Sequence, residues 1–137
     1  MTNRTFAPAG YRSVTPYFIV PKADAMIDFM REVFAAELLN RNVGDGGRVA
    51  HAEVRIGDSI VELSEGNETF PPRANTIHIF VEHTDDCYAR AMRAGSRSLY
   101  EPADMPYGER SAGVEDPFGN HWYIATFAGG GDKGYYS

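Results

Sequence analysis

Glutamate, histidine and tyrosine side chains recur on one face of three strands that the sequence predicts. Alternation along these strands turns Glu62, His78 and Tyr123 away from the apolar face that each strand packs under a helix. A carboxylate and an imidazole can bind a divalent metal or move a proton, and a phenol ring can stack on a ligand. The three side chains therefore indicate a site for metal-assisted chemistry or for binding.

Aromatic side chains of the same face favour a small organic ligand. Tyr17, Phe80 and Tyr123 would present their rings there, and Tyr107 lies on a nearby loop. Such rings can stack on a planar or partly apolar molecule while a few polar groups fix its orientation. The candidate polar groups are His51, Glu53, Glu62, His78 and Arg110.

Each of these candidates also has a purely structural interpretation. Glu62 could pair with Arg55 or Arg110, and His78 could be a hydrogen-bonded, half-buried histidine. The aromatic side chains could simply fill a small cleft. Cys87, near the start of a predicted helix, is expected to be a packing residue rather than a reactive thiol. These alternatives stay open at the level of the sequence.

The elements that must position these side chains repeat one order twice. Segments rich in β-branched residues predict strands, and an amphipathic segment predicts a helix after the first strand of each copy. The first copy comprises a strand at 14–20, a helix at 23–36 and strands at 37–42, 48–56 and 59–64. The second comprises a strand at 77–81, a helix at 85–94 and strands at 98–100, 110–115 and 121–127. Thr84 or Asp85 is the expected N-cap of the second helix, and Gly95 its C′ residue.

The β-α-β-β-β order, repeated at an offset of about sixty residues, indicates a duplicated unit. It predicts an α+β fold in one domain, with a first module at about 11–65 and a second at about 76–128. Each sheet would have one face under its helix, and two such sheets facing each other would make a cleft. Residues 66–75 are predicted to be a linker, 100–110 a flap or a plain connection, and 129–137 a flexible tail.

The composition of the 137 residues excludes several classes of protein. Thirteen basic against nineteen acidic side chains give a net charge of −6, the opposite of the balance that nucleic-acid binding favours. The apolar runs are far shorter than the roughly 20 residues of a membrane span. Cys87 is the only cysteine, which rules out an internal disulfide, and residues 1–8 lack the apolar stretch of an export signal. We therefore expect a cytoplasmic protein that binds neither nucleic acid nor membrane.

Three stretches of the chain resemble a known family. They are GYRSVTPY at residues 10–17, HAEVRIGD at 51–58 and DPFGNHW at 116–122. They look like the PhnB-like branch of the vicinal oxygen chelate superfamily, which includes glyoxalases, bleomycin-resistance proteins and extradiol dioxygenases. The resemblance implies paired βαβββ modules, a homodimer and a ligand cleft between the sheets.

The resemblance also implies where a metal would bind. In metal-dependent relatives, four ligands come from the first and last strands of each module, which places them here at Thr15, Glu62, His78 and Tyr123. Glu62 and His78 are types that bind Zn, Ni, Mn or Fe, whereas a neutral hydroxyl and a phenol are poor ligands. The predicted metal set is therefore incomplete, although His51 could supply a third ligand.

Two functions follow as expectations from this resemblance. The first is a protein that binds a small organic molecule in the cleft without a complete metal site. The alternative is a metal-dependent lyase, isomerase or dioxygenase that uses Glu62 and His78. In that case Glu62 would be the catalytic residue, acting as a ligand and as a general base next to a chelated carbonyl.

Overall fold

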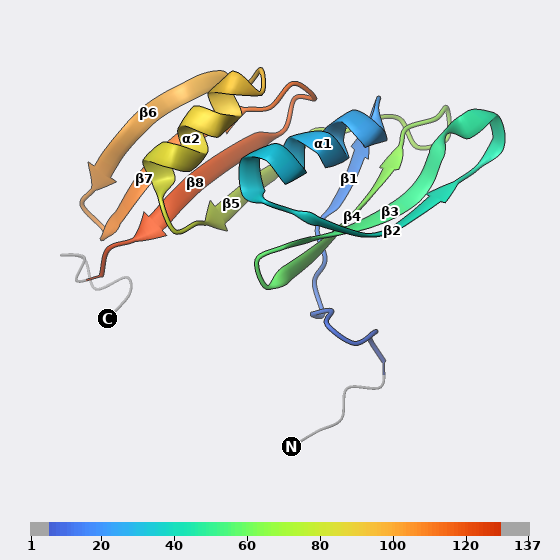
Figure 1. Ribbon diagram of the computed structural model, residues 1–137, viewed down its shortest axis with the longest axis horizontal. Coiled ribbons are helices and arrows are strands. Elements are labelled where there is room, and N and C mark those ends of the chain that lie inside the picture. The colour runs from blue at the N-terminus through green and yellow to red at the C-terminus, as the bar shows by residue number, and fades with distance from the viewer. Residues whose placement is uncertain (1–5, 130–137) are drawn as a thin grey trace. The chain divides into compact units, whose positions relative to one another are not determined.

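The computed structural model describes residues 6–129 of the chain. Over this range it contains two four-stranded sheets and two α-helices, which form two compact units (Figure 1). The first unit includes residues 6–31 and 35–73, and the second includes 32–34 and 74–129. The predicted α+β fold of two βαβββ modules is confirmed. The predicted flexible tail lies outside the described residues, except for its first one.

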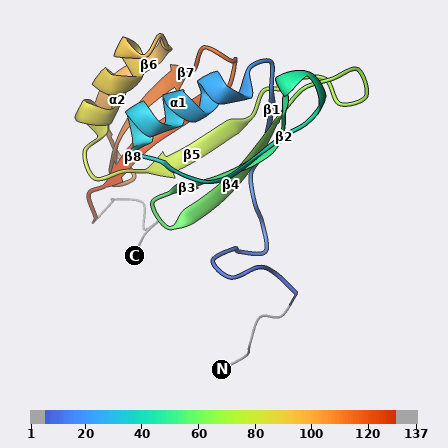
Figure 2. The same ribbon diagram turned by 45° about the vertical axis from the view of Figure 1, so that its right-hand side comes forward.

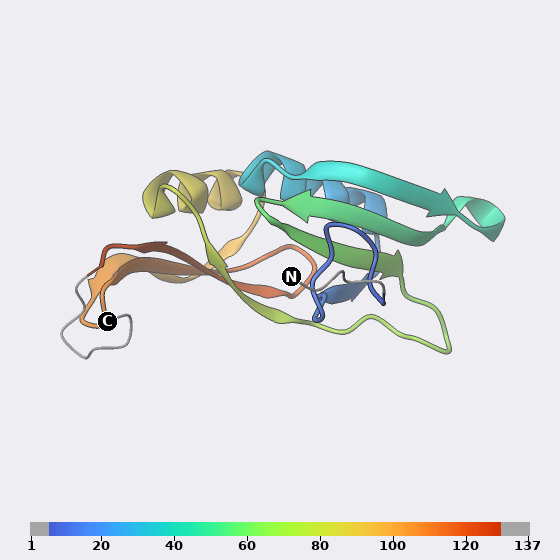
Figure 3. The ribbon, with the colours of Figure 1, turned by 90° about the horizontal axis from the view of Figure 1, so that it is seen from below.

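The first unit follows the predicted order of elements. These are β1 (Tyr17–Val20), α1 (Ala23–Phe34), β2 (Glu37–Val43), a short 3₁₀ turn (Asp45–Gly47), β3 (Val49–Ile56) and β4 (Ser59–Glu65). The strands lie in the order β1-β4-β3-β2, in which β1 runs parallel to β4 and the other pairs are antiparallel. After β4 the chain turns back along the outer edge of β1, where the N–H of Arg73 donates to the carbonyl of Ile19 (Figure 3).

One side of α1 and one face of this sheet are buried together. Met26, Ile27 and Met30 recur at helical spacing and are at most 2% exposed. The buried strand residues alternate as predicted and are Phe18, Val20, Ala52, Val54, Val61 and Leu63. The helix ends where Ala35 adopts a left-handed conformation with φ of 56°. The opposite face of the sheet carries no helix of this unit and bears the predicted site residues.

The second unit repeats this architecture. Its elements are β5 (Thr76–Phe80), α2 (Thr84–Arg93), β6 (Arg97–Met105), β7 (Glu109–Glu115) and β8 (His121–Phe127). The strand order is β5-β8-β7-β6, and α2 packs on β6, β7 and β8 (Figure 2). Ala112, Val114, Trp122 and Ile124 are buried on the α2 side. Neither helix described between residues 6 and 129 is long and apolar enough to cross a membrane.

Two details of the second unit differ from the sequence prediction. The strand expected at 98–100 extends from Arg97 to Met105, so that only residues 106–108 connect it to β7, and no flap forms. This strand includes Pro102 because β6 is an edge strand with an irregular register, where a missing N–H removes no ladder bond. The N-cap of α2 is His83, without a side-chain cap, and Thr84 is the first helical residue, whose hydroxyl donates to the carbonyl of Arg110.

Cys87 of α2 is fully buried, and its Sγ lies 3.6 Å from the carbonyl oxygen of Val33. Burial raises the pKa of this thiol from 9.0 to about 11. Since the thiolate is the reactive form, we expect Cys87 at pH 8 to react with a disulfide reagent about 100-fold more slowly than an unperturbed thiol. The rate should reach that of a free thiol in denaturant. Rapid modification of the folded protein would contradict this assignment.

Candidate functional site

The helix-free face of the first sheet brings together four of the predicted site residues. Glu53 of β3 and Glu62 of β4 are direct neighbours in the strand register, and Tyr17 of β1 is the other neighbour of Glu62. His51 lies two residues before Glu53 and therefore shares its face. The parallel β1–β4 pairing, which no local pattern specifies, sets Tyr17 beside Glu62.

The polar side chains on this face form hydrogen-bonded pairs. His51 Nε2 lies 2.6 Å from Glu62 Oε1, and both side chains are about one-quarter to one-third exposed. The ring of Tyr17, which is 42% exposed, lies 6.2 Å from the His51 ring. The structural interpretation of Glu62 as a partner of Arg55 does not hold, since Arg55 pairs with Glu37 at 2.7 Å. Glu62 is thus held by an imidazole, with an aromatic ring beside the pair.

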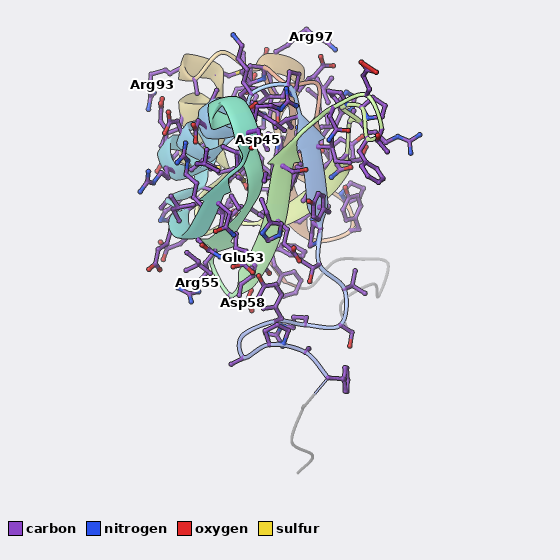
Figure 4. The ribbon with its side chains drawn as sticks, turned by 90° about the vertical axis from the view of Figure 1, so that its right-hand side faces the viewer. Asp45, Glu53, Arg55, Asp58, Arg93 and Arg97 are labelled. Atoms are coloured by element: carbon purple, nitrogen blue, oxygen red, sulfur yellow. The ribbon has the colours of Figure 1, made fainter. Side chains whose placement is uncertain are left out.

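The segment before β1 adds Tyr11 to this group. Its hydroxyl donates a hydrogen bond to Glu53 Oε2. Burial and the carboxylates of Glu53 and Glu62 raise the pKa of Tyr11, so this phenol stays protonated and acts as a donor. Figure 4 shows Glu53 between Asp45 at one end of the sheet and Asp58 at the other. Asp45 and Asp58 lie in the turns at the two ends of β3, and the carboxylates on the face itself are those of Glu53 and Glu62.

A cavity of about 560 Å³ adjoins these residues within the first unit. It lies between the open face of the sheet, the turn from β2 to β3, and the segment after β4. Its lining residues are Tyr17, Ile19, Gly44, Asp45, Arg48, Val49, Ala50, Ser64, Glu65, Asn67 and Phe70. The volume is in the range of small-molecule sites, and Tyr17 belongs both to the cavity wall and to the group around Glu62.

The helix-free face of the second sheet carries a similar combination. His78 Nε2 lies 3.2 Å from Glu109 Oε2, and the Glu109 side chain is almost completely buried. Phe80 is 56% exposed, and its ring lies 4.8 Å from the His78 ring. Tyr123 is the register neighbour of His78, and its ring lies 6.2 Å from that of Tyr100. The predicted residues His78, Phe80 and Tyr123 are thus brought together, with Glu109 and Tyr100 added.

Arg110 and Tyr107 are the other two predicted site residues of the second unit. Arg110 points to the α2 side, where it forms an ion pair with Asp85 at 2.6 Å and a second with Asp104 at 3.1 Å. These carboxylates raise the pKa of the guanidinium, and Arg110 lowers that of Asp85. Tyr107 lies in the short turn between β6 and β7. Arg110 therefore does not share the surface that bears His78.

Within the part of the chain that the structure describes, neither unit gathers enough donor side chains to hold the metal that the family implies. Among the described residues, no group of three or more His, Cys, Asp or Glu side chains could hold a metal ion. The first unit offers His51 with Glu62, and the second offers His78 with Glu109, in each case two donors that hydrogen-bond to each other. Neither unit by itself fits a metal centre, and we derive no reaction step through a metal.

Sequence reasoning missed Tyr11, Glu109 and the cavity. Glu109 was detectable, because Ala112 and Val114 mark the α2 side of β7 and strand alternation then turns Glu109 to the other face. The same argument assigns Arg110 to the α2 side. Tyr11 lies in an irregular segment without periodicity, and the cavity depends on contacts between segments far apart in the sequence. No local sequence pattern therefore predicts either of them.

Each βαβββ unit carries aromatic and polar side chains on the face of its sheet that no helix of that unit covers. This paired-module architecture is the one that the three sequence motifs imply. A family model described as the Glyoxalase/Bleomycin resistance protein/Dioxygenase superfamily matches residues 13–124. The chain belongs to this superfamily, which confirms the resemblance to vicinal oxygen chelate proteins.

Curated relatives and solved structures agree with this assignment. The uncharacterized protein Mb0911c of Mycobacterium bovis is 32% identical over 123 residues, which cover 82% of this chain and 81% of the relative. The structure of TioX from Micromonospora sp. ML1 matches with a TM-score of 0.72 at 22% identity, over 85% of this chain and 98% of TioX. A PhnB protein from Bacillus cereus, titled a putative 3-demethylubiquinone-9 3-methyltransferase, matches with a TM-score of 0.70 at 16% identity, over 84% and 99%. At these identities the two structures show the fold.

Proposed function

We propose that this protein binds a small organic molecule on the helix-free face of its first sheet. The observation that carries the proposal is the position of Tyr17, which joins the His51–Glu62 pair to a cavity of about 560 Å³. A mostly apolar cavity beside a few fixed polar groups is the usual form of a small-molecule site. The superfamily, which includes bleomycin-resistance proteins by name, supports the same class of function.

Each residue of the first unit has a defined part in this proposal. The partly exposed ring of Tyr17 stacks on a planar part of the ligand. Glu62 accepts a hydrogen bond from the ligand with the oxygen that does not face His51, while the imidazole fixes the orientation of the carboxylate. Glu53 has the same capacity and is oriented by Tyr11. The site is thus organised before the ligand arrives, which lowers the entropic cost of binding.

The helix-free face of the second sheet also offers side chains that can bind a small organic molecule. His78, Phe80 and Tyr123 offer one imidazole and two aromatic rings to a ligand, and Glu109 orients the imidazole. The homodimer and the metal-dependent alternative stay predictions. Titration with Zn, Ni, Mn and Fe(II), compared between wild type and His78→Ala, tests the metal.

Replacement of Tyr17 by alanine is expected to weaken binding of a planar ligand about 10-fold, because it removes the stacking surface. Tyr17→Phe keeps the ring and should bind within about 2-fold of wild type. The ligand is selected by screening planar heteroaromatic fragments against ¹⁵N-labelled protein, with shift changes expected around residues 17–19, 49–53 and 62–64. If fragments shift only other regions, or if Tyr17→Ala binds as tightly as wild type, the proposed site is wrong.

A further inference from the structure

Apolar and aromatic side chains form much of the lining of the cavity at one end of the first sheet, beside the polar residues Asp45, Arg48, Ser64, Glu65 and Asn67. Val49 of β3 is 1% exposed and belongs to the lining, as do Tyr17 and Ile19 of the edge strand β1. Phe70 lies on the segment after β4 and is 64% exposed at the rim. Both of these rings line the cavity, so an aromatic group bound there can contact Tyr17 and Phe70. The lining therefore fits an aromatic or aliphatic part of a ligand.

The segment that carries Phe70 is held in place by several hydrogen bonds. The guanidinium of Arg48 donates to the carbonyl of Gly66. The backbone N–H of Asn67 donates to the carbonyl of Phe70 at 2.9 Å, and the backbone N–H of Phe70 donates to Asn67 Oδ1 at 2.7 Å. Arg73 then joins the segment to the edge of β1. These hydrogen bonds fix the conformation of the loop that carries Phe70, so Phe70 has a defined position in the cavity lining.

The apolar cavity and the His51–Glu62 pair are close enough for one ligand to reach both. Ser64 lines the cavity and lies two residues after Glu62 on β4, a separation of about 7 Å along a strand. Tyr17 bridges the two regions from the neighbouring strand. A ligand with a bicyclic ring and one short polar arm spans this distance.

The charges around the cavity favour a cationic arm. Asp45 and Glu65 belong to the cavity lining, and Glu62 and Glu53 follow on the open face. Arg48 is the basic residue among the lining residues, and the carboxylates of Asp45 and Glu65 outnumber it. A ligand ammonium would gain a charge-assisted hydrogen bond to Glu62, whereas a ligand carboxylate would be repelled.

We propose that the ligand is a two-part organic cation, with an aromatic portion held in the cavity between Tyr17 and Phe70 and a protonated nitrogen at Glu62. This inference rests on the proposed function and deepens it by naming the chemical class of the ligand. It also gives Phe70 and Glu62 separate roles, since Phe70 contributes affinity and Glu62 selects charge.

Three matched probes separate these roles: 1-naphthylmethylamine, 1-naphthylmethanol and 1-naphthylacetate. Calorimetry or NMR titration of the full chain is expected to give a Kd for the amine at least about 10-fold lower than for the acetate. Phe70→Ala should raise the Kd of all three probes by a similar factor of about 5 to 10. Glu62→Gln should lower the preference for the amine, although Asp45, Glu65 and Glu53 remain, and should leave the Kd of the alcohol unchanged. Glu37→Gln, which neutralises an exposed carboxylate on β2, is the matched control and should leave the order of the probes unchanged.

The inference is overturned if the acetate binds as tightly as the amine, if Phe70→Ala leaves all three Kd values unchanged, or if no naphthyl probe binds. It is also overturned if Glu37→Gln lowers the amine preference as much as Glu62→Gln, since the selectivity would then come from net charge. The proposed function survives each of these results if other planar molecules still bind in a Tyr17-dependent way. Loss of Tyr17 dependence for every ligand overturns both.

Discussion

Replacing Asp116 by alanine is expected to lower the free energy of unfolding of the second unit by about 3–5 kcal/mol. Asp116 is 3% exposed, and its carboxylate accepts hydrogen bonds from four groups. They are the indole of Trp122 at 2.8 Å, the amide of Asn120 at 3.0 Å, and the backbone N–H groups of Phe118 at 2.8 Å and Asn120 at 2.9 Å.

The size of this effect follows from the buried hydrogen-bond donors that lose their acceptor when the carboxylate of Asp116 is removed. Trp122 and Asn120 are 1% and 0% exposed, and an unsatisfied buried donor costs about 1–3 kcal/mol. Asn120 in turn accepts from the backbone N–H of Asn75 at 2.8 Å, just before β5. Loss of Asp116 therefore disturbs both the turn before β8 and the start of β5.

Urea unfolding followed by tryptophan fluorescence measures this loss directly, because Trp122 is the only tryptophan and lies in the core of the second unit. Asp116→Asn should give an intermediate loss, since its amide oxygen can replace only some of the acceptor positions. Asp104→Ala, in the same unit but 85% exposed, is the matched control and should leave the midpoint nearly unchanged. Equal midpoints for Asp116→Ala and Asp104→Ala would refute the assigned role.

Much of the fold was predictable because alternation and helical spacing are local signals. The buried faces of β3 and β4 followed from alternating apolar residues, and the helix bounds were correct to within two residues. The extension of β6 through Pro102 was not predictable, since it depends on β6 lying at a sheet edge. Whether a proline is tolerated is decided by the strand's neighbours, which a local pattern does not contain.

The candidate site was predictable only in part for the same reason. Alternation placed His51, Glu53 and Glu62 on one face, and the register then brought them together. The hydrogen bond from Tyr11 to Glu53 joins residues 42 positions apart. Tyr11 lies in an irregular segment, so no periodic pattern in the sequence predicts this bond. Long-range pairings set these contacts, whereas the local sequence sets which face each residue occupies.

Replacing Gly113 by alanine is expected to lower the free energy of unfolding of the second unit by about 2 kcal/mol. A Cβ at this position would lie 2.5 Å from Cε2 of the Tyr100 ring and 2.8 Å from Cδ2. The ring cannot move away freely, because its hydroxyl is hydrogen-bonded to Ser111 at 2.7 Å and its face lies near Tyr123. The same fluorescence-detected unfolding experiment measures the loss.

A double-mutant cycle with Tyr100→Ala identifies the clash as the cause. Once the ring is gone, the added methyl group meets no obstacle, and alanine in a strand is favoured over glycine by about 0.5–1 kcal/mol. Gly113→Ala is therefore expected to destabilise the wild type but to stabilise the Tyr100→Ala protein. This reversal of sign separates a steric role of Gly113 from a need for backbone freedom, which would destabilise both backgrounds equally. Glycine at 113 is then explained by the tyrosine that lies over it, and Tyr100 is fixed on the surface that also presents Tyr123 and His78.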